Sequence, residues 1–466
     1  MPMQDPNAIT RLILEAARKA REETSDEPEP DLVKPARWPI ECTVGPGLEG
    51  AIACESKVGY VNGSKGWLVY RGYDIFDLCA YSTFEEVSYL LLHGNLPSAS
   101  ELTEFNERLM EYRYLNQTLR LLLGFPLEQM NTMAALRLGT NLMRQEFTHR
   151  DERTGHPVLG DVIGSDEDSI PMETVPKGER RAIYEFRQKN KAKRSRANEL
   201  FDKASGIDSC YHLLSGVATI AATIARVNQG CMPIDPDPTL SFAANFLYMI
   251  SGRRPTPVEE RVMDVALILH ADHGMNASTF AAMVVASTLS DVYFSVGSGI
   301  AALNGPLHGG ANQQVIIALK AAHASGDSRR WIRDALDKKA KVPGFGHRVY
   351  KAYDPRARVM GPLAKFLVED DPEVKALYEV AEVIEEEVVA RLGAEKQVFP
   401  NVDFYSGLVY RSMGIDSEMF TPIFAVSRVA GWTARVQEYL QRNRIFRPRA
   451  RYVGEFNKQY VPVDER

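Results

Sequence analysis

Histidines and arginines that could do chemistry stand beside glycine or proline at several separated places in this sequence. His308 lies in Gly305-Pro306-Leu307-His308-Gly309-Gly310, and a helix-like run follows at 311–322. Glycines let the backbone approach a ligand closely, and the positive end of a helix dipole opposes protonation of a nearby imidazole. A histidine in a glycine-rich turn is more often structural than catalytic. Alone, His308 therefore predicts no more than a neutral imidazole that can donate a hydrogen bond.

Four further stretches carry residues of the same kinds. Converging arginines bind planar carboxylates through paired hydrogen bonds. A histidine donor beside a carboxylate base is suited to removing a proton from carbon next to a carbonyl. If the fold brings these groups together, they predict enolisation chemistry on or beside a polycarboxylate. The stretches are 269–279 with His270, Asp272 and His273, 342–356 with His347, Lys351 and Arg356, 400–407 with Asp403, and 427–449 with Arg428 and Arg447.

Other chemistries fit the sequence less well. A zinc site needs three or four converging ligands, and His270, Asp272 and His273 lack the spacing of a helical zinc motif. The sequence has no GxSxG serine motif, no Walker loop and no GxGxxG after a predicted strand. We therefore expect no metal, no serine nucleophile and no nucleotide-binding fold.

The length and charge of the chain narrow the class of protein. With 466 residues, 45% of them hydrophobic and 25% charged, the chain suits one large or two globular domains. A net charge of -6 argues against general nucleic-acid binding. We expect no signal peptide and no apolar run able to span a bilayer. The sequence thus predicts a cytoplasmic protein with no membrane and no nucleic-acid partner.

The cysteines give no sign of a disulfide framework or a metal knuckle. There are five of them, an odd number, and none forms a CxxC pair. We expect reduced, buried thiols at Cys42, Cys54, Cys79, Cys210 and Cys231.

Helical periodicity dominates the sequence from about residue 83 onward. Thr83 with Glu86, and Thr256 with Glu259, are capping-box signals at helix starts. The pattern predicts a mainly α-helical protein. The elements expected are short strands at 59–63 and 67–70, and helices at 9–21, 84–92, 100–114, 207–229, 239–250, 256–270, 278–290, 291–303, 311–322, 372–392, 407–413 and 422–440.

Residues 145–205 interrupt this pattern, because they are rich in charge and proline and poor in apolar residues. Their basic run at 177–196 is most simply a solvated insertion with one exposed helix. A role in binding CoA phosphates or a partner subunit is the alternative that a basic run in an acidic protein leaves open.

The five stretches that carry the histidines, the arginines and Asp403, in the order in which they follow one another along the chain, resemble the citrate synthase family. Segments 47–75, 84–97 and 233–251 are similar to the family as well. The likeness extends over about residues 45–143 and 207–454.

The resemblance implies an all-α fold with a large and a small helical domain and the active site in the cleft between them. Residues 1–40 would form a polar N-terminal extension. The large domain would comprise 41–308 and 414–466, with the charged insertion at about 145–205, and the small domain 309–413.

The resemblance also implies an acyltransferase that condenses acetyl-CoA with oxaloacetate and hydrolyses citryl-CoA to citrate and CoA. Asp403 is similar to the base that removes the methyl proton, and His347 to the group that polarises the oxaloacetate ketone. His273 and His308 are similar to two histidines that contact oxaloacetate and the enol, and the resemblance alone lets the two be exchanged. Because a helix-like run follows the glycines of His308, we assign the enol donor to His308 and oxaloacetate binding to His273.

The remaining implied contacts concern carboxylates, CoA and a second subunit. Arg356, Arg428 and Arg447 would hold the oxaloacetate carboxylates, with Arg447 lent by the neighbouring subunit of a homodimer or higher homo-oligomer. The resemblance implies no metal and no redox cofactor, since the CoA thioester is a substrate. The implied CoA contacts are Val342, Pro343, Gly344, Phe345, Gly346 and Lys351.

Two departures from the family pattern stand out. Gly274 occupies a position where many members have glutamate or another polar residue, and Phe125-Pro126-Leu127 replaces a frequent His-Pro-Met. Two alternatives stay open. One is a 2-methylcitrate synthase, which takes propionyl-CoA and shares these residues, and the other is a non-catalytic relative acting as a regulator or scaffold.

Overall fold

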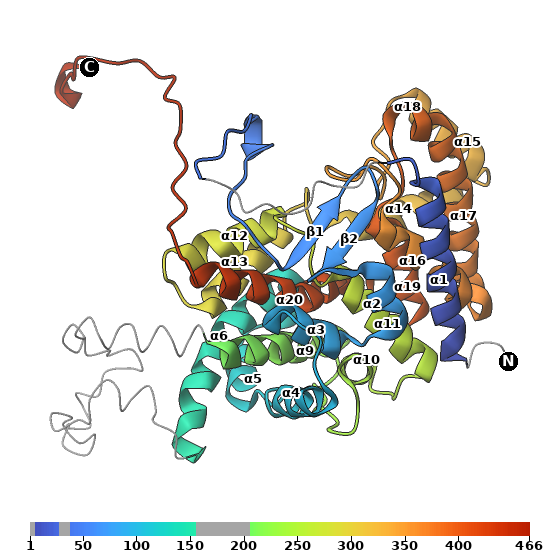
Figure 1. Ribbon diagram of the computed structural model, residues 1–466, viewed down its shortest axis with the longest axis horizontal. Coiled ribbons are helices and arrows are strands. Elements are labelled where there is room, and N and C mark those ends of the chain that lie inside the picture. The colour runs from blue at the N-terminus through green and yellow to red at the C-terminus, as the bar shows by residue number, and fades with distance from the viewer. Residues whose placement is uncertain (1–4, 28–37, 155–205) are drawn as a thin grey trace.

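Helices build most of the computed structural model of this protein, which describes residues 5–27, 38–154 and 206–466 (Figure 1). The mainly α-helical fold predicted from the sequence is confirmed. The first helices are α1 (Pro6–Glu23), α2 (Ile75–Tyr81), α3 (Phe84–His93), α4 (Ala99–Glu111), α5 (Asn116–Leu122) and α6 (Thr132–Thr154).

The helices after residue 206 form two further groups and one long C-terminal helix. The second group is α9 (Ile207–Asn228), α10 (Phe242–Ser251), α11 (Pro257–His270), α12 (Ala277–Ser287) and α13 (Val292–Leu303). The third is α14 (Ala311–Ala324), α15 (Ser328–Asp337), α16 (Pro355–Leu367), α17 (Pro372–Val388), α18 (Ala394–Lys396) and α19 (Val402–Ser412). The long helix is α20 (Phe420–Leu440). Short helical turns lie at Pro46–Leu48, Leu127–Gln129, Val368–Asp370, Val389–Gly393, Ser417–Met419 and Val463–Glu465.

One small antiparallel sheet accompanies the helices. Strands β1 (Gly59–Asn62) and β2 (Trp67–Tyr70) confirm the two predicted strands, and β3 (Tyr73–Asp74) extends the sheet beyond β2. In the β1–β2 pair, Gly59 lies opposite Tyr70. This register turns the buried Tyr70 side chain toward the loop that follows α11, where its hydroxyl contacts Asp272.

The capping signals explain where several helices begin. Thr256 and Glu259 form the predicted reciprocal capping box at the start of α11. At α3, Thr83 accepts the predicted hydrogen bond from the backbone N–H of Glu86. The Glu86 carboxylate instead accepts from the Ser82 hydroxyl, so the second half of that box is not formed as predicted.

Some predicted boundaries are wrong, and one of them matters for function. The sequence predicted a loop through Asp403 and a helix from Gly407. In the structure α19 begins at Val402, because the Asn401 side chain accepts a hydrogen bond from the Asp403 N–H and caps the helix. Asp403 is therefore held in the first turn of a helix. Likewise, the helix predicted from Thr239 begins only after its N-cap, Ser241.

The predicted charged insertion begins inside a helix. From residue 145 the chain continues as α6 up to Thr154. The rest of the insertion, 155–205, including the predicted exposed helix at 177–196, lies outside the described residues.

Helix α9 contradicts the expectation that no apolar run is long enough to span a bilayer. Among the described helices it alone meets a membrane-span criterion of length and hydropathy, over Ile207–Asn228. However, 83% of its most apolar window is buried inside the protein, where α6, α10 and α20 pack against it. Its composition is thus that of a central core helix.

The cysteines are all free thiols. Cys79 and Cys210 are buried as expected, whereas Cys42 is exposed, so the expectation of uniform burial is wrong.

The N-terminal segment contributes to the core. Residues of the expected polar extension form α1, whose buried face includes Ile9 and Ile13. In Figure 1, α1 lies along the edge of the molecule, where it packs against α2, α11 and α16. Its amphipathic pattern, visible in the sequence, is therefore used for packing.

We predict that Ile13→Ala lowers the free energy of unfolding by about 2–5 kcal/mol, because it removes a side chain that is 1% exposed and leaves a cavity. Leu14→Ala is the matched control, since Leu14 is 37% exposed and should tolerate truncation. Denaturant unfolding of both variants measures the difference. Equal stabilities would contradict a docked α1.

Candidate active site

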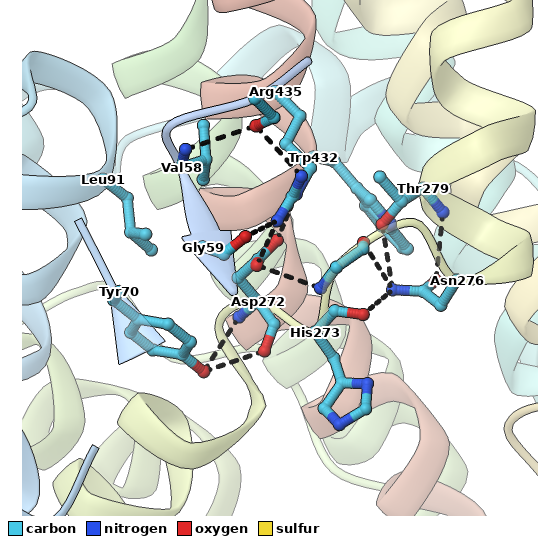
Figure 2. A network of polar contacts seen from close by, with 12 residues as sticks. Val58, Gly59, Tyr70, Leu91, Asp272, His273, Asn276, Thr279, Trp432 and Arg435 are labelled. Carbon is cyan, nitrogen blue, oxygen red and sulfur yellow. Dashed lines mark hydrogen bonds and ion pairs between the residues drawn. The ribbon is translucent and has the colours of Figure 1, made fainter. Parts of the chain in front are cut away.

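A buried ion pair fixes the loop that carries His273. Both Asp272 oxygens accept hydrogen bonds from Arg435 of α20, at 2.7 Å from Nε and 2.7 Å from Nη2 (Figure 2). Arg435 also donates to the Ser56 hydroxyl, at 3.1 Å, and to the Gly59 carbonyl, at 3.3 Å. The pair thus joins α20, the start of β1 and the loop after α11.

The backbone of this loop is held as tightly as its side chains. The Tyr70 hydroxyl accepts from the Asp272 N–H at 3.1 Å and donates to the Asp272 carbonyl at 2.9 Å. A Cβ added at Gly59 would lie 2.6 Å from Asp272 Oδ2, and one at Gly431 would lie 2.3 Å from the Ala271 carbonyl oxygen. Only glycine fits at these two positions. The imidazole of His273 projects away from this network, as Figure 2 shows.

Three rings meet where His273 projects. His273 Nε2 lies 3.1 Å from the Tyr350 hydroxyl, and the His273 and His347 rings are 5.1 Å apart. His347 Nδ1 accepts the backbone N–H groups of Val349, at 3.0 Å, and Tyr350, at 3.2 Å. The His347 proton must therefore sit on Nε2, which leaves one N–H free to donate. Burial lowers the pKa of His347 to about 4, so this ring is neutral at physiological pH.

Two buried arginines lie in the same region. Asp354 accepts from Arg356 Nε at 3.0 Å and from Nη2 at 2.7 Å, so the guanidinium is held rigidly, and Nη1 has no hydrogen bond to the residues that the structure describes. Arg428 donates from Nε to the His270 carbonyl at 2.5 Å. Within the described chain, Arg428 Nη2 is buried and has no hydrogen-bond partner. An unpaired buried guanidinium nitrogen is costly, so this donor is suited to bind an anionic group.

The charged groups of this region influence one another. Burial lowers the pKa of His273 well below its usual range, and Arg356 and Arg428 both lower it further. Burial also lowers the pKa of Arg428 to about 10, partly countered by Asp272. Two cations therefore face neutral histidines in a desolvated site, which favours binding of a dianion.

Asp403 faces the same arginines from the first turn of α19. Burial raises the pKa of Asp403 to about 6, although Arg356 and Arg428 act in the opposite direction. Among the described residues, nothing donates a hydrogen bond to either carboxylate oxygen of Asp403. A carboxylate with a raised pKa and no fixed donor is suited to accept a proton.

The predicted CoA loop, 342–346, lies directly beside Asp403. The Asn401 N–H donates to the Gly344 carbonyl at 2.8 Å, and the Asn401 side chain donates to the Gly346 carbonyl at 3.0 Å. Farther along, the Lys351 N–H donates to the Gly63 carbonyl at the tip of the β1–β2 hairpin, at 2.9 Å. The Lys351 side chain is exposed.

His308 lies at the N-terminus of a helix, as predicted, but this helix is not the one that the sequence indicated. The helix that follows its glycines is α14, whereas the N–H that faces His308 Nε2, at 3.3 Å, belongs to Ser278 in the first turn of α12. The Ser278 hydroxyl lies 2.8 Å from the same nitrogen. This environment favours the tautomer in which Nε2 accepts and Nδ1 carries the proton. Burial, followed by Arg428, lowers the pKa of His308 to about 4.

With this geometry in view, the comparisons with known proteins are decisive. A family model described as "Citrate synthase, C-terminal domain" matches residues 47–449. The chain belongs to the citrate synthase family. The citrate synthase of Haloferax volcanii is 41% identical over 422 residues, which cover 90% of this chain and 98% of that protein. The citrate synthase of Deinococcus radiodurans is 39% identical, covering 91% of this chain and 99% of that protein.

Solved citrate synthase structures share the fold. The enzyme from Pyrobaculum aerophilum aligns with a TM-score of 0.73 and 36% identity, over 94% of this chain and 100% of that one. The Thermoplasma acidophilum enzyme, solved in a ternary complex with carboxymethyl coenzyme A and oxaloacetate, aligns with a TM-score of 0.73 and 30% identity, over 91% of this chain and 100% of that one. The all-α citrate synthase fold predicted from the resemblance is therefore confirmed.

Arg447, which the family resemblance predicts to bind oxaloacetate, lies away from the other predicted site residues of its own chain. Phe446 is anchored by its N–H to the Ser287 hydroxyl at the C-terminal end of α12, at 3.2 Å. His308 contacts Ser278 at the other end, about 14 Å away along the helix axis. Arg447 follows Phe446 on an exposed tail that leads away from the body (Figure 1), and within the described ranges its side chain donates to the Pro448 carbonyl alone, at 3.1 Å. The structure brings together the other predicted histidines, arginines and Asp403, but not Arg447.

Several residues of the site were missed by sequence reasoning. They are Ser278, Tyr350, Asp354 and Arg435. One signal was available for Arg435, because it follows Arg428 by seven residues and so lies on the same face of α20. The described residues contain no cluster of three or more histidine, cysteine or acidic side chains that could hold a metal ion.

We predict that Gly344→Ala destabilises the protein by about 2–4 kcal/mol. Gly344 has a φ of +78°, and an added Cβ would lie 2.8 Å from Val315 and 2.9 Å from Phe404. Gly346→Ala is the matched control, because Gly346 also has a φ of +78° but has open space around it, so only the backbone cost of about 1 kcal/mol applies. Thermal unfolding compares the two. Equal losses of stability in the two variants would show that the loop at 342–346 does not pack against α19.

Proposed function

We propose that this enzyme condenses acetyl-CoA with oxaloacetate and then hydrolyses citryl-CoA, which releases citrate and CoA. The single observation that carries the proposal is the buried, unpartnered Nη2 of Arg428 beside Arg356, two neutral histidines and Asp403. Relatives named citrate synthase, at 41% and 39% identity, support the same activity. The enzyme is an acyltransferase whose acyl group becomes an alkyl group on transfer.

Oxaloacetate binds through its two carboxylates. Arg428 Nη2 and the free Nη1 of Arg356 are the donors for them, and His273 donates alongside. Asp354 fixes the Arg356 fork before substrate arrives, so little side-chain freedom is lost on binding. Charged donors in a desolvated site favour a dicarboxylate over neutral competitors.

Enolisation of acetyl-CoA is the difficult step, because a thioester methyl is a very weak acid. Asp403 accepts a methyl proton, and the electron pair of the broken C–H bond moves toward the thioester oxygen. His308, protonated on Nδ1, donates a hydrogen bond to that oxygen as its charge grows. A neutral donor suits this task, since the lowered pKa of His308 prevents it from becoming an imidazolium that would pair with Asp403.

Carbon–carbon bond formation follows. The enol carbon attacks the ketone carbon of oxaloacetate, and His347 Nε2–H donates to the ketone oxygen as it becomes an alkoxide. Water then cleaves the thioester of citryl-CoA. Closure of the small domain, 309–413, over the large domain excludes water until the condensation is complete.

CoA lies along the loop beside Asp403. Val342, Pro343, Gly344, Phe345 and Gly346 contact its adenine, and the exposed Lys351 meets a phosphate. The hydrogen bonds from Asn401 to this loop set the distance between the bound thioester and Asp403. The reaction uses no metal and no redox cofactor.

Assembly completes the site. Arg447 of a second copy supplies the remaining contact to oxaloacetate, since the tail that carries it leads away from the site of its own chain. The enzyme is therefore a homodimer or higher homo-oligomer. We place it in the cytoplasm, without membrane or nucleic-acid partners. A regulator or scaffold without activity would not need the full set of His308, His347 and Asp403.

We predict that kcat/KM falls as the pH drops through about 6. The pKa of Asp403 is raised to about 6, and only its ionised form accepts a proton, so activity is full above this pH and lost below it. His308 and His347, with pKa values of about 4, stay neutral throughout. Asp403→Asn should lower kcat by about 10²- to 10⁴-fold. Asp337→Asn, which changes an exposed carboxylate, is the control, and undiminished CoA release by Asp403→Asn would refute the role of the base.

We predict faster turnover with acetyl-CoA than with propionyl-CoA at equal concentrations. The relatives reported above are named citrate synthases, which supports this preference. Release of free CoA, followed with a thiol reagent after mixing each thioester with oxaloacetate, measures it. A clear preference for propionyl-CoA would identify a 2-methylcitrate synthase instead.

A further inference from the structure

Helix α1 touches both proposed domains. It precedes the segment that the family model matches, which begins at residue 47. It packs against α2 and α11, which lie within 41–308, and against α16, which lies within 309–413. The family pattern therefore does not account for α1, and its contacts cross the boundary over which the small domain would move.

Helix α1 contacts the large domain along α2 and α11, and its buried face is apolar. Ile9 and Ile13 are fully buried. The Thr10 hydroxyl donates to the Ala80 carbonyl at the end of α2, at 3.3 Å. Apolar burial with a fixed hydrogen bond keeps α1 attached to this side.

Helix α1 also packs against the small domain along α16, and Glu23 makes a charged contact there. Glu23, the last residue of α1, forms an ion pair with Arg358, whose side chain is only 7% exposed. A carboxylate at a helix C-terminus is unfavourable because of the helix dipole, so its pairing with Arg358 accounts for its position. The Arg358 guanidinium also lies 4.4 Å from the centre of the Tyr353 ring.

A groove of about 750 Å³ lies along this interface, beside the contacts of α1 with α16. The Glu23–Arg358 ion pair adds a polar link to these contacts. Lining residues include Leu12, Ala16 and Lys19 of α1 and Gly361, Tyr378 and Tyr405 across from it.

We propose that α1 is a strap that holds the small domain against the large one, and that Glu23 acts through Arg358 as a positioning residue for Arg356. Arg356 and Arg358 share the first turn of α16, so fixing one fixes the start of the helix that carries the other. In this arrangement residues of both domains meet, with the His273 and His347 rings 5.1 Å apart. The inference rests on the proposed function, which supplies the carboxylate that Arg356 binds.

The strap sets the fraction of enzyme molecules in which the two domains are arranged to bind oxaloacetate. Apparent affinity falls in proportion to the fraction of molecules in the assembled arrangement. Saturating oxaloacetate restores that arrangement, so a loosened strap raises KM and leaves kcat unchanged. A merely structural role would instead lower kcat by inactivating part of the protein, with KM unchanged.

The test compares Glu23→Gln with Glu22→Gln in the full-length protein. Glu22 is the matched control, because it is exposed and pairs only with Arg18, at 3.3 Å. Glu23→Gln should raise the KM for oxaloacetate by about 5-fold or more, with an unchanged kcat and an unchanged melting temperature, and Glu22→Gln should match the wild type. Equal KM values for the two variants, or a lower kcat at constant KM, would overturn the strap.

A double-mutant cycle tests whether Glu23 acts on the KM for oxaloacetate through its ion pair with Arg358. Arg358→Gln alone and the double variant should show the same KM as Glu23→Gln, because each removes one contact. If the two substitutions raised KM additively in the double variant, Glu23 would not act through Arg358.

Two measurements separate this inference from the proposed function. Wild-type turnover with acetyl-CoA and oxaloacetate comes first, and its absence would overturn the proposed function. Hydrogen exchange of the amides at 355–367 needs no turnover. Faster exchange in Glu23→Gln than in Glu22→Gln is the result expected of a strap, and equal exchange overturns it.

Discussion

The ion pair between Asp272 and Arg435 is the interaction on which the rest of the site depends. Both side chains are buried, and a second pair of hydrogen bonds from Tyr70 holds the same loop by its backbone. Removing one member of such a pair would leave an uncompensated charge in the interior, which costs several kcal/mol. The position of His273 and the start of α12 both follow from this loop. These two buried charges therefore fix the loop that carries His273.

A second constraint is the balance of charge within the site. Asp354 offsets Arg356, and Asp272 lies near both Arg428 and Arg435. The histidines add no further charge, because burial and the arginines hold their pKa values low. With Asp403 ionised, the three aspartates of the cluster balance its three arginines, so the charges are compensated within the cluster. Electrostatic preorganisation of this kind needs no movement of charge at the moment of reaction.

Much of this could be predicted from the sequence, and the failures have physical causes. Glycine and proline around His308 and His347, together with helix caps such as Thr256, are local signals, and the sequence displays them directly. The N-terminus that faces His308 belongs to α12, some thirty residues earlier, and no local pattern pairs it with that ring. Asn401 was overlooked as a cap, so the start of α19 was placed too late. Partners distant in the chain, such as Arg435 for Asp272, arise only from tertiary packing.

Helix α9 has a consequence for how the chain is made. Its apolar surface is covered partly by α6, which is synthesised before it, and partly by α20, which is completed roughly 200 residues later. At a translation rate of about 5–20 residues per second, the surface reserved for α20 remains uncovered for about 10 to 40 s. During that interval the nascent chain displays a segment that resembles a membrane span. The surface of α9 that α20 covers is therefore among the last parts of this core to be buried as the chain is synthesised.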